Sequence, residues 1–213
     1  MARVSLEGDS GQAEPAAVAR ERIVSTAHDL FARYGLKAIG IDRIIAEAGV
    51  AKTTLYRHFR SKEELVLAVL QRREEIWLER WLLPAIAARG DTPEAQLLAI
   101  FDAFDEWFRR PDYEGCLFTK ALFEAHDRTS TIGAACVMRL ANVRAAVRGL
   151  AEQAGVRDAD TFAHQWQNLM FGTFAQACGG HTEAAREARA TGELLLQSQG
   201  LAPPGGAVET RAL

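Results

Sequence analysis

The chain has 213 residues, 48% of them apolar and 25% charged, and its net charge is −3 at pH 7. This length corresponds to one or two domains, and the apolar content excludes a mostly disordered chain because it is enough for a buried core. The slightly acidic balance excludes a uniformly basic nucleic-acid coat. Alanine occurs 38 times, and runs of β-branched residues are few. We therefore expect an all-α fold.

The first predicted helix covers residues 17–34, where Ile23, Leu30 and Phe31 recur at helical spacing and Gly35 follows the last residue. Two short helices are expected at 41–48 and 52–59, separated by the tight turn Gly49-Val50-Ala51. Ser61 and Glu64 then have the spacing of a capping box. They predict a longer helix that ends near residues 81–83, before Pro84.

Further helices are predicted over residues 93–108, 114–126, 132–154, 158–178 and 182–197. Thr92 and Pro93 have the residue types of an N-cap and a first helical position. Asp158 or Asp160 caps the fourth of these helices, and Gly179-Gly180 ends it. The terminal segments, 1–16 and 201–213, are expected to be flexible tails.

The three cysteines, Cys116, Cys136 and Cys178, are widely spaced and form no C-x-x-C pair. This pattern argues against a disulfide framework or a zinc site, and no other cluster points to a metal or cofactor. No segment approaches the roughly 18 uninterrupted apolar residues of a membrane span, and the amino terminus has no apolar signal sequence. We expect a cytoplasmic protein that holds no cofactor.

Positive charge gathers around the two short helices. Between Gly40 and Lys62, five basic side chains stand against two acidic ones, whereas residues 67–213 hold 15 basic and 19 acidic side chains. A charged stretch of this kind is more often a solvated surface than a nucleic-acid site. Two short helices across a glycine turn, however, are the arrangement of a helix-turn-helix.

The second short helix has an apolar and a polar face. Leu55 and Phe59 are four residues apart and are predicted to point inward, together with Ile44, Ile45 and Val50. The outward face is predicted to carry Lys52, Thr53, Tyr56 and Arg57, side chains that suit base edges and phosphates in the major groove. Alternatives stay open: Tyr56 can pack in a core, and His58 can make a local hydrogen bond.

These residues resemble the tetracycline-repressor (TetR-type) family of transcriptional regulators. The resemblance is carried by Ile23–Phe31 followed by Tyr34-Gly35, by Ile44–Val50, and above all by Gly49–Phe59 leading into Lys62–Leu65. Beyond the first third of the chain it extends only to the number and order of helices. Ala51 and Gly40 depart from the family pattern, which has a hydroxyl residue at both places.

The resemblance implies a homodimer that places two recognition helices in successive major grooves of a near-palindromic operator. It implies a DNA-binding domain over residues 17–77, with the helix-turn-helix at 40–59, and an effector-binding and dimerisation domain over 78–200. Lys52, Thr53 and Arg57 match positions that approach bases. The positions that match phosphate contacts are Thr54, Tyr56, His58 and Lys62, and Arg43 could contact either.

Aromatic residues concentrate between residues 77 and 166, as an ordinary core or as the lining of a cavity. Since the family binds effectors in its second domain, we expect an apolar or aromatic small molecule there. The candidate lining residues are Trp81, Phe104, Trp107, Phe118, Phe123 and Trp166, with Cys116 and His126 as polar contacts.

The last two helices offer a broad apolar surface that is predicted to pair with a second copy of the chain. Its candidate residues are Phe162, Leu169, Met170, Phe174, Leu194 and Leu195. The alternative is packing within one chain.

The sequence therefore predicts a regulator, most simply a repressor that a small effector releases from double-stranded operator DNA, and not an enzyme. The alternative, a helical enzyme with Cys116 as nucleophile and His126 as base, has no spacing that catalysis requires. A purely architectural DNA protein is disfavoured by the acidic carboxy-terminal part.

Overall fold

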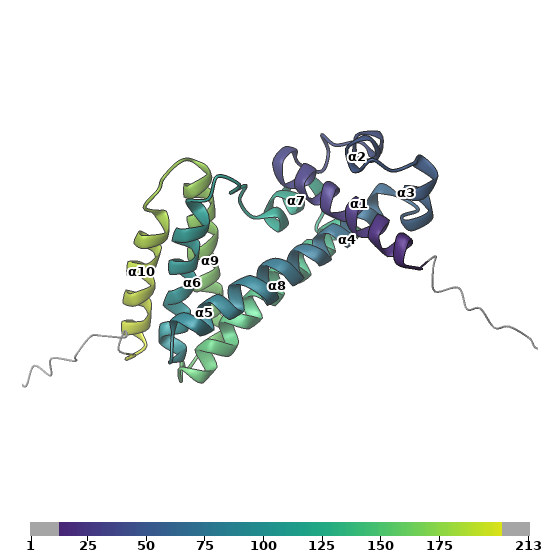
Figure 1. Ribbon diagram of the computed structural model, residues 1–213. Coiled ribbons are helices and arrows are strands. Elements are labelled where there is room, and N and C mark those ends of the chain that lie inside the picture. The colour runs from purple at the N-terminus through teal and green to yellow at the C-terminus, as the bar shows by residue number, and fades with distance from the viewer. Residues whose placement is uncertain (1–12, 202–213) are drawn as a thin grey trace, which may run out of the picture. The chain divides into compact units, whose positions relative to one another are not determined.

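The computed structural model describes residues 13–201, and every regular element in that range is a helix (Figure 1). The expected all-α fold is confirmed. The chain divides into two compact units on either side of the bond between Arg72 and Arg73. The predicted domain boundary lies a few residues later, after residue 77, and the assignment of a separate function to each part stays a prediction.

The predicted flexible tails fall largely outside the described residues. Two parts are described: residues 13–16 belong to α1 (Ala13–Tyr34), which begins before the predicted start at residue 17, and Leu201 packs against the core of the second unit. Within residues 13–201, no helix combines the length and the apolar character that crossing a membrane requires.

The first unit consists of α1, α2 (Ile41–Ala48), α3 (Lys52–His58) and most of α4 (Lys62–Glu74). Helices α2 and α3 both pack against α1 and against each other. Its core is formed by side chains that are almost completely buried, among them Ile23, Phe31, Ile39, Ile44, Leu55, Phe59 and Leu65. Apolar residues at helical spacing on these helices therefore supply the core, as the sequence predicts.

The turn between α2 and α3 depends on Gly49, whose φ of 62° is left-handed. Its N–H donates to the carbonyl of Ala46, and the N–H of Val50 donates to that of Ile45, each at 3.3 Å. This is the Schellman pattern, in which glycine avoids the strain that a Cβ would meet at positive φ. The turn thus brings α3 back against α1.

Helix α4 begins with a capping arrangement close to the predicted one. The Ser61 hydroxyl accepts a hydrogen bond from the N–H of Glu64 at 3.1 Å. The Glu64 carboxylate accepts from the N–H of Arg60 at 2.7 Å, where a capping box would use the N–H of Ser61. The two hydrogen bonds therefore stabilise the N-terminus of α4, as the spacing indicates.

The predicted helix end before Pro84 is wrong. The chain continues from α4 through a π-helix, η1 (Glu75–Leu82), into α5 (Leu83–Arg89), and Gly90 is the C-cap. The N–H of Leu83 donates to the carbonyl of Leu78, five residues back. Pro84 falls in the first turn of α5, where its missing N–H is tolerated. Residue spacing alone does not reveal this change of hydrogen-bond pattern.

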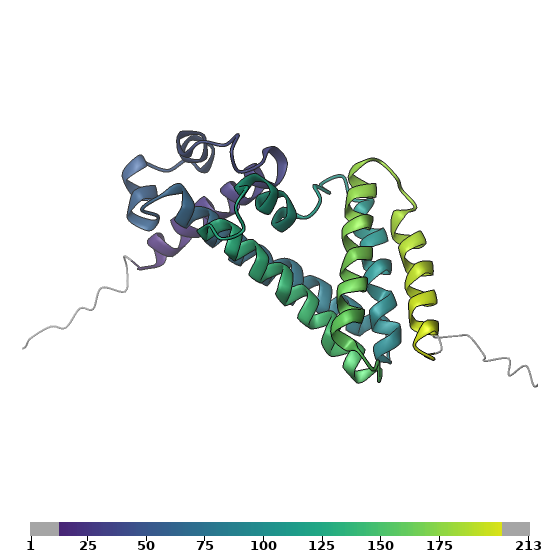
Figure 2. The same ribbon diagram turned by 180° about the vertical axis from the view of Figure 1, so that it is seen from behind.

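The second unit contains η1, α5, α6 (Pro93–Phe108), α7 (Leu117–Ala125), α8 (Thr131–Gln153), α9 (Ala159–Cys178) and α10 (Ala184–Ser198). Side-chain oxygens of Thr92, Ser130 and Asp158 cap α6, α8 and α9. Helices α6, α9 and α10 lie side by side, and α8 packs against α6, α7 and α9 (Figures 1 and 2).

Aromatic packing holds these helices together. Trp166 of α9 is fully buried, stacks on Phe162 with 5.3 Å between ring centroids, and lies 5.3 Å from the Phe101 ring of α6. Helix α10 reaches this cluster through Gly192, where an added Cβ would lie 2.8 Å from the Trp166 ring. The absence of a side chain at Gly192 therefore sets how closely α10 approaches.

We predict that Gly192→Ala lowers the free energy of unfolding by about 1–3 kcal/mol, because the new methyl group overpacks a rigid, buried ring. Gly149→Ala in α8 is the control, since an added Cβ there meets nothing within 4 Å. It should raise the free energy of unfolding by about 0.5–1 kcal/mol through helix propensity. Urea titration followed by circular dichroism compares the two, and equal effects would contradict the packing argument.

Candidate nucleic-acid interface and ligand pocket

Helix α3 presents a polar face over an apolar one. Leu55 and Phe59 are completely or almost completely buried. Lys52, Thr53, Tyr56 and Arg57 are exposed, and Thr54 and His58 are half-buried. The side chains predicted to point outward therefore do so, and Tyr56, 45% exposed, is not part of the core. Their contact with DNA stays a prediction.

Two of the cations on this surface are held by exposed carboxylates. Arg43 Nε lies 2.8 Å from Glu47 Oε1 on α2, and Lys52 Nζ lies 3.3 Å from Asp42 Oδ1. Exposed pairs of this kind contribute about 0–1 kcal/mol, so both cations can exchange their carboxylate for a phosphate at little cost. Arg57 makes no ion pair within residues 13–201.

Arg43 is also held by Tyr34, the last residue of α1. Its guanidinium lies 4.4 Å from the ring centroid of Tyr34, which is exposed. Hydrogen bonds with Arg33 and then Arg43 hold the pKa of Tyr34 below its usual value. Tyr34 thus supports the surface cation from the end of α1.

Lys62 has a structural role that the sequence does not indicate. Its ammonium group donates to the carbonyl of Leu36 at 2.5 Å and lies 5.9 Å from the centroid of the Phe31 ring. The side chain is half-buried and connects the start of α4 to the turn that follows α1. Its predicted phosphate contact would have to share the ammonium group with these neighbours.

The two departures from the family pattern are visible at the helix starts. Gly40 and Ala51 are the N-cap residues of α2 and α3, and neither provides a side-chain acceptor. Because alanine in place of serine or threonine costs about 1 kcal/mol at an N-cap, α3 depends on the packing of Leu55 and Phe59.

Comparisons with known proteins agree with this geometry. Residues 23–69 match the family described as "Bacterial regulatory proteins, tetR family". An HTH-type transcriptional regulator of Staphylococcus aureus (strain USA300) is 42% identical over 59 residues, 28% of this chain. That match spans 32% of the relative, so the chain covers about a third of its length.

Solved structures are similar over most of the chain. The TetR-family regulator SCO4454 of Streptomyces coelicolor is 28% identical, with a TM-score of 0.76 over 85% of this chain and 96% of that one. A TetR regulator of Chloroflexus aurantiacus shares the fold, at 24% identity and a TM-score of 0.75 over 87% and 98% of the two chains.

The fold and the short-helix pair define a helix-turn-helix protein of the all-α class. Residues 23–69 carry the match to the TetR family, and the fold of the chain is shared with solved structures of TetR-family transcriptional regulators.

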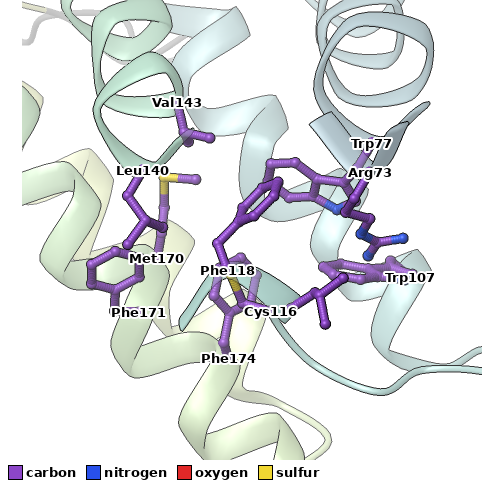
Figure 3. Close-up of a pocket in the computed structure, with 11 residues that line it drawn as sticks. Arg73, Trp77, Trp107, Cys116, Phe118, Leu140, Val143, Met170, Phe171 and Phe174 are labelled. Carbon is purple, nitrogen blue, oxygen red and sulfur yellow. The ribbon is translucent and has the colours of Figure 1, made fainter. Parts of the chain in front are cut away.

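The second unit contains a small, mainly apolar pocket (Figure 3). Its free space is about 10 Å³, roughly enough for one water molecule. Trp107, Cys116 and Phe118, three of the predicted ligand-binding residues, line it. The other lining residues are Arg73, Trp77, Leu117, Leu140, Val143, Met170, Phe171 and Phe174.

The other predicted lining residues lie elsewhere. Phe104 and Trp166 are buried in the core, and Trp81 packs on Trp107 with ring centroids 5.4 Å apart. Phe123 is 71% exposed, because α7 turns Phe118 and Ala121 inward and Phe123 outward. His126 is exposed and has a φ of 59° at the C-cap of α7. Aromatic content alone does not separate these positions.

Three of the predicted dimer residues are instead packed within their own unit. Phe162, Met170 and Phe174 are buried in the core that α9 shares with its neighbours. Leu194 is 65% exposed, and Leu169 and Leu195 are half-buried. The reason is the width of the apolar surface on α9, part of which α8 and α10 of the same chain already cover.

The catalytic alternative gains no support from the cysteine environments. Cys116 is half-buried in the pocket and His126 is exposed at the end of α7. Burial raises the pKa of the Cys136 thiol to about 11. Among the residues that the structure describes, no three His, Cys, Asp or Glu side chains gather as metal ligands.

We predict that Lys62→Met lowers the free energy of unfolding by about 0.5–1.5 kcal/mol, because the Leu36 carbonyl loses its donor. Lys52→Met, which removes an exposed cation, should change stability by less than about 0.5 kcal/mol. Urea unfolding of both variants is the measurement. Equal stabilities would show that the Lys62 hydrogen bond contributes nothing to the fold.

Proposed function

We propose that the protein is a homodimeric, ligand-responsive repressor that acts in the cytoplasm on a near-palindromic DNA operator. The carrying observation is the polar face of α3, with Lys52, Thr53, Tyr56 and Arg57 exposed above a buried Leu55 and Phe59. An α-helix of this kind fits the major groove of B-DNA.

The roles of the polar side chains follow from their chemistry and position. Lys52, Thr53 and Arg57 approach base edges, since guanidinium and ammonium groups pair with guanine and a hydroxyl pairs with several bases. We assign the phosphate contacts to Thr54, Tyr56, His58, Lys62 and Arg43. In this arrangement base contacts set the sequence preference and phosphate contacts set the register on the duplex.

Effector binding in the second unit would release the DNA. In a dimer, the two recognition helices must keep the spacing of about 34–36 Å that separates successive major grooves. To move the DNA-bound fraction from about 99% to 1%, the effector must favour the released conformation by about 5.5 kcal/mol. Helix α4 supports this route because it begins beside the helix-turn-helix at Lys62 and its residue Arg73 lines the pocket.

A two-fold contact through α9 and α10 would form the dimer. After the core is complete, Leu194 stays exposed, Leu169 and Leu195 stay half-buried, and Gly172 and Ala175 leave room for a close approach. Pairing these surfaces across a two-fold axis removes apolar area from water on both copies.

Selection of bound sequences from a random DNA pool should yield an inverted repeat. Arg57→Ala should cost about 1–3 kcal/mol of binding free energy on that operator and relax base preference at one position. Arg157→Ala, which removes an exposed cation from the second unit, is the control and should change neither. Affinity should fall with salt at a log-log slope near −0.9 for each phosphate contact. Recovery of no enriched sequence would contradict the proposal.

Leu194→Glu should weaken dimerisation by at least about tenfold, because it places a charge in an apolar contact. Met138→Glu on α8 is the matched control, since Met138 is also exposed but lies outside the proposed surface. Sedimentation equilibrium measures the dissociation constants. A monomeric wild-type chain, or equal effects of both variants, would contradict the proposed interface.

A further inference from the structure

The pocket contains a cation and a polar hydrogen that an apolar effector would leave without a partner. Arg73 and Trp77 come from consecutive turns of α4 and η1 and both line the cavity. Figure 3 shows the Arg73 guanidinium, the Trp77 ring and the Trp107 ring at one side of the cavity and Leu140, Met170 and Phe171 at the other.

The guanidinium of Arg73 is held by an aromatic ring and not by a carboxylate. Its central carbon lies 5.5 Å from the centroid of the Trp107 ring. Within residues 13–201 the structure gives Arg73 no ion pair. Burial is the main cause that lowers the pKa of Arg73 below its usual value. The surroundings of Arg73 therefore disfavour its charged form. An anion bound in the pocket would reduce the free-energy cost of burying this charge.

The nearest carboxylates along the chain have other partners. Glu74, the next residue, lies 3.0 Å from the guanidinium of Arg139 and accepts a hydrogen bond from Asn142 at 2.6 Å. Asp112, which acts on Arg73 only through space, is paired with Arg110 at 2.7 Å. Glu114 also acts on Arg73 through space, ahead of Asp112, so these carboxylates offset part of the charge without forming an ion pair with the guanidinium.

Trp77 provides an independent observation. Its side chain is only 6% exposed, and its indole Nε1–H is buried without a hydrogen-bond acceptor. A buried donor without an acceptor costs free energy, so such groups are rare outside functional sites. Trp166 Nε1 is also unpartnered, but Trp166 does not line the pocket. Among the buried unpartnered side-chain atoms of the described residues, Trp77 Nε1 is the one that belongs to a residue lining this pocket, where Arg73 also lies.

We propose that the effector is a hydrophobic organic anion of the arylalkyl carboxylate class. Its carboxylate would bind the Arg73 guanidinium and the Trp77 indole N–H, and its apolar body would replace contacts among Phe118, Met170 and Phe174. A guanidinium can donate two parallel hydrogen bonds to a carboxylate, which matches this head group better than an alcohol or an amine.

This proposal rests on the ligand response proposed above and adds to it the charge of the ligand. The free space of about 10 Å³ is far smaller than any such molecule. The bound state therefore needs the lining side chains to move apart, and Phe118 belongs to the short helix α7. Ligand binding thus requires a change in packing, which a repressor can couple to DNA release.

The test uses the purified full-length protein and isothermal titration calorimetry. The probes are 3-phenylpropanoate, 4-phenylbutanoate and 5-phenylpentanoate, each with the alcohol of the same carbon skeleton. We expect at least one acid to bind about tenfold more tightly than its alcohol, since only the acid supplies the charged acceptor. Equal affinities for acid and alcohol, or no binding of any of the three acids, overturn the proposal.

Arg73→Met keeps an unbranched, flexible side chain and removes the charged guanidinium. It should weaken acid binding by about 10- to 100-fold, the range for hydrogen bonds to a charged group, and leave alcohol binding unchanged. Arg80→Met, an exposed arginine of η1, is the matched control and should leave both affinities unchanged. An undiminished preference for the acid in Arg73→Met overturns the proposal.

Trp77→Phe keeps an aromatic ring and removes only the N–H donor, so it tests the same head-group contact if Arg73→Met does not fold. Its acid affinity should fall by about tenfold while the alcohol affinity is unchanged. Equal losses for acid and alcohol would assign Trp77 to packing alone and overturn its part in the site.

Operator release separates this inference from the proposed function. An acid that binds through Arg73 but leaves the operator complex intact would contradict the ligand-responsive repressor and leave the anion site standing. Release of DNA by the neutral alcohols, with the same response in Arg73→Met, would support the repressor and overturn the anion site.

Discussion

The burial of Leu55 and Phe59 is the interaction on which the DNA-binding surface depends. Helix α3 has seven residues and no side-chain N-cap, and an isolated helix of this length is unstable in water. Tertiary packing must therefore supply its stability, and it comes from two side chains on one face. The same contacts fix the direction of the opposite face. The polar residues of α3 therefore point into solvent because of how Leu55 and Phe59 are packed. The left-handed Gly49 completes this arrangement because it turns the chain sharply enough to bring α3 back onto α1.

The second unit meets a different constraint, the presence of an arginine among aromatic rings. Arg73 is half-buried and stabilised by the face of Trp107, an interaction that contributes about 0.5–2 kcal/mol, depending on how far it is desolvated. That is less than burial of an unpaired charge costs, so the site is destabilised in the absence of a ligand. Polar groups held in such a state are typical of binding sites, where the ligand completes the interactions. The π-helix that carries Trp77 fits this view, since π-helical turns occur frequently at functional sites.

Much of the first unit could be predicted from the sequence because its signals are local. Helical spacing places Leu55 inward, and Gly49 marks the turn; both are confirmed by the structure. The pocket could not be predicted in this way. Phe118 and Phe123 are similar in sequence terms, and only the direction of α7 places one in the cavity and the other in solvent. Arg73 belongs to a helix rich in charged residues, so no local pattern distinguishes it from its exposed neighbours. The π-helix likewise could not be predicted, because neither the residue types nor their spacing over this segment indicates it.

The closed state of the pocket also bears on the speed of regulation. A cavity with room for about one water molecule cannot hold a larger molecule as it stands, so an effector is accommodated only when the surrounding helices move apart. Capture then proceeds at the frequency of these movements and more slowly than free diffusion allows. A brief rise in the concentration of the compound would therefore fill few of the pockets, whereas a sustained concentration would fill most of them. Such a sensor averages its chemical environment over time.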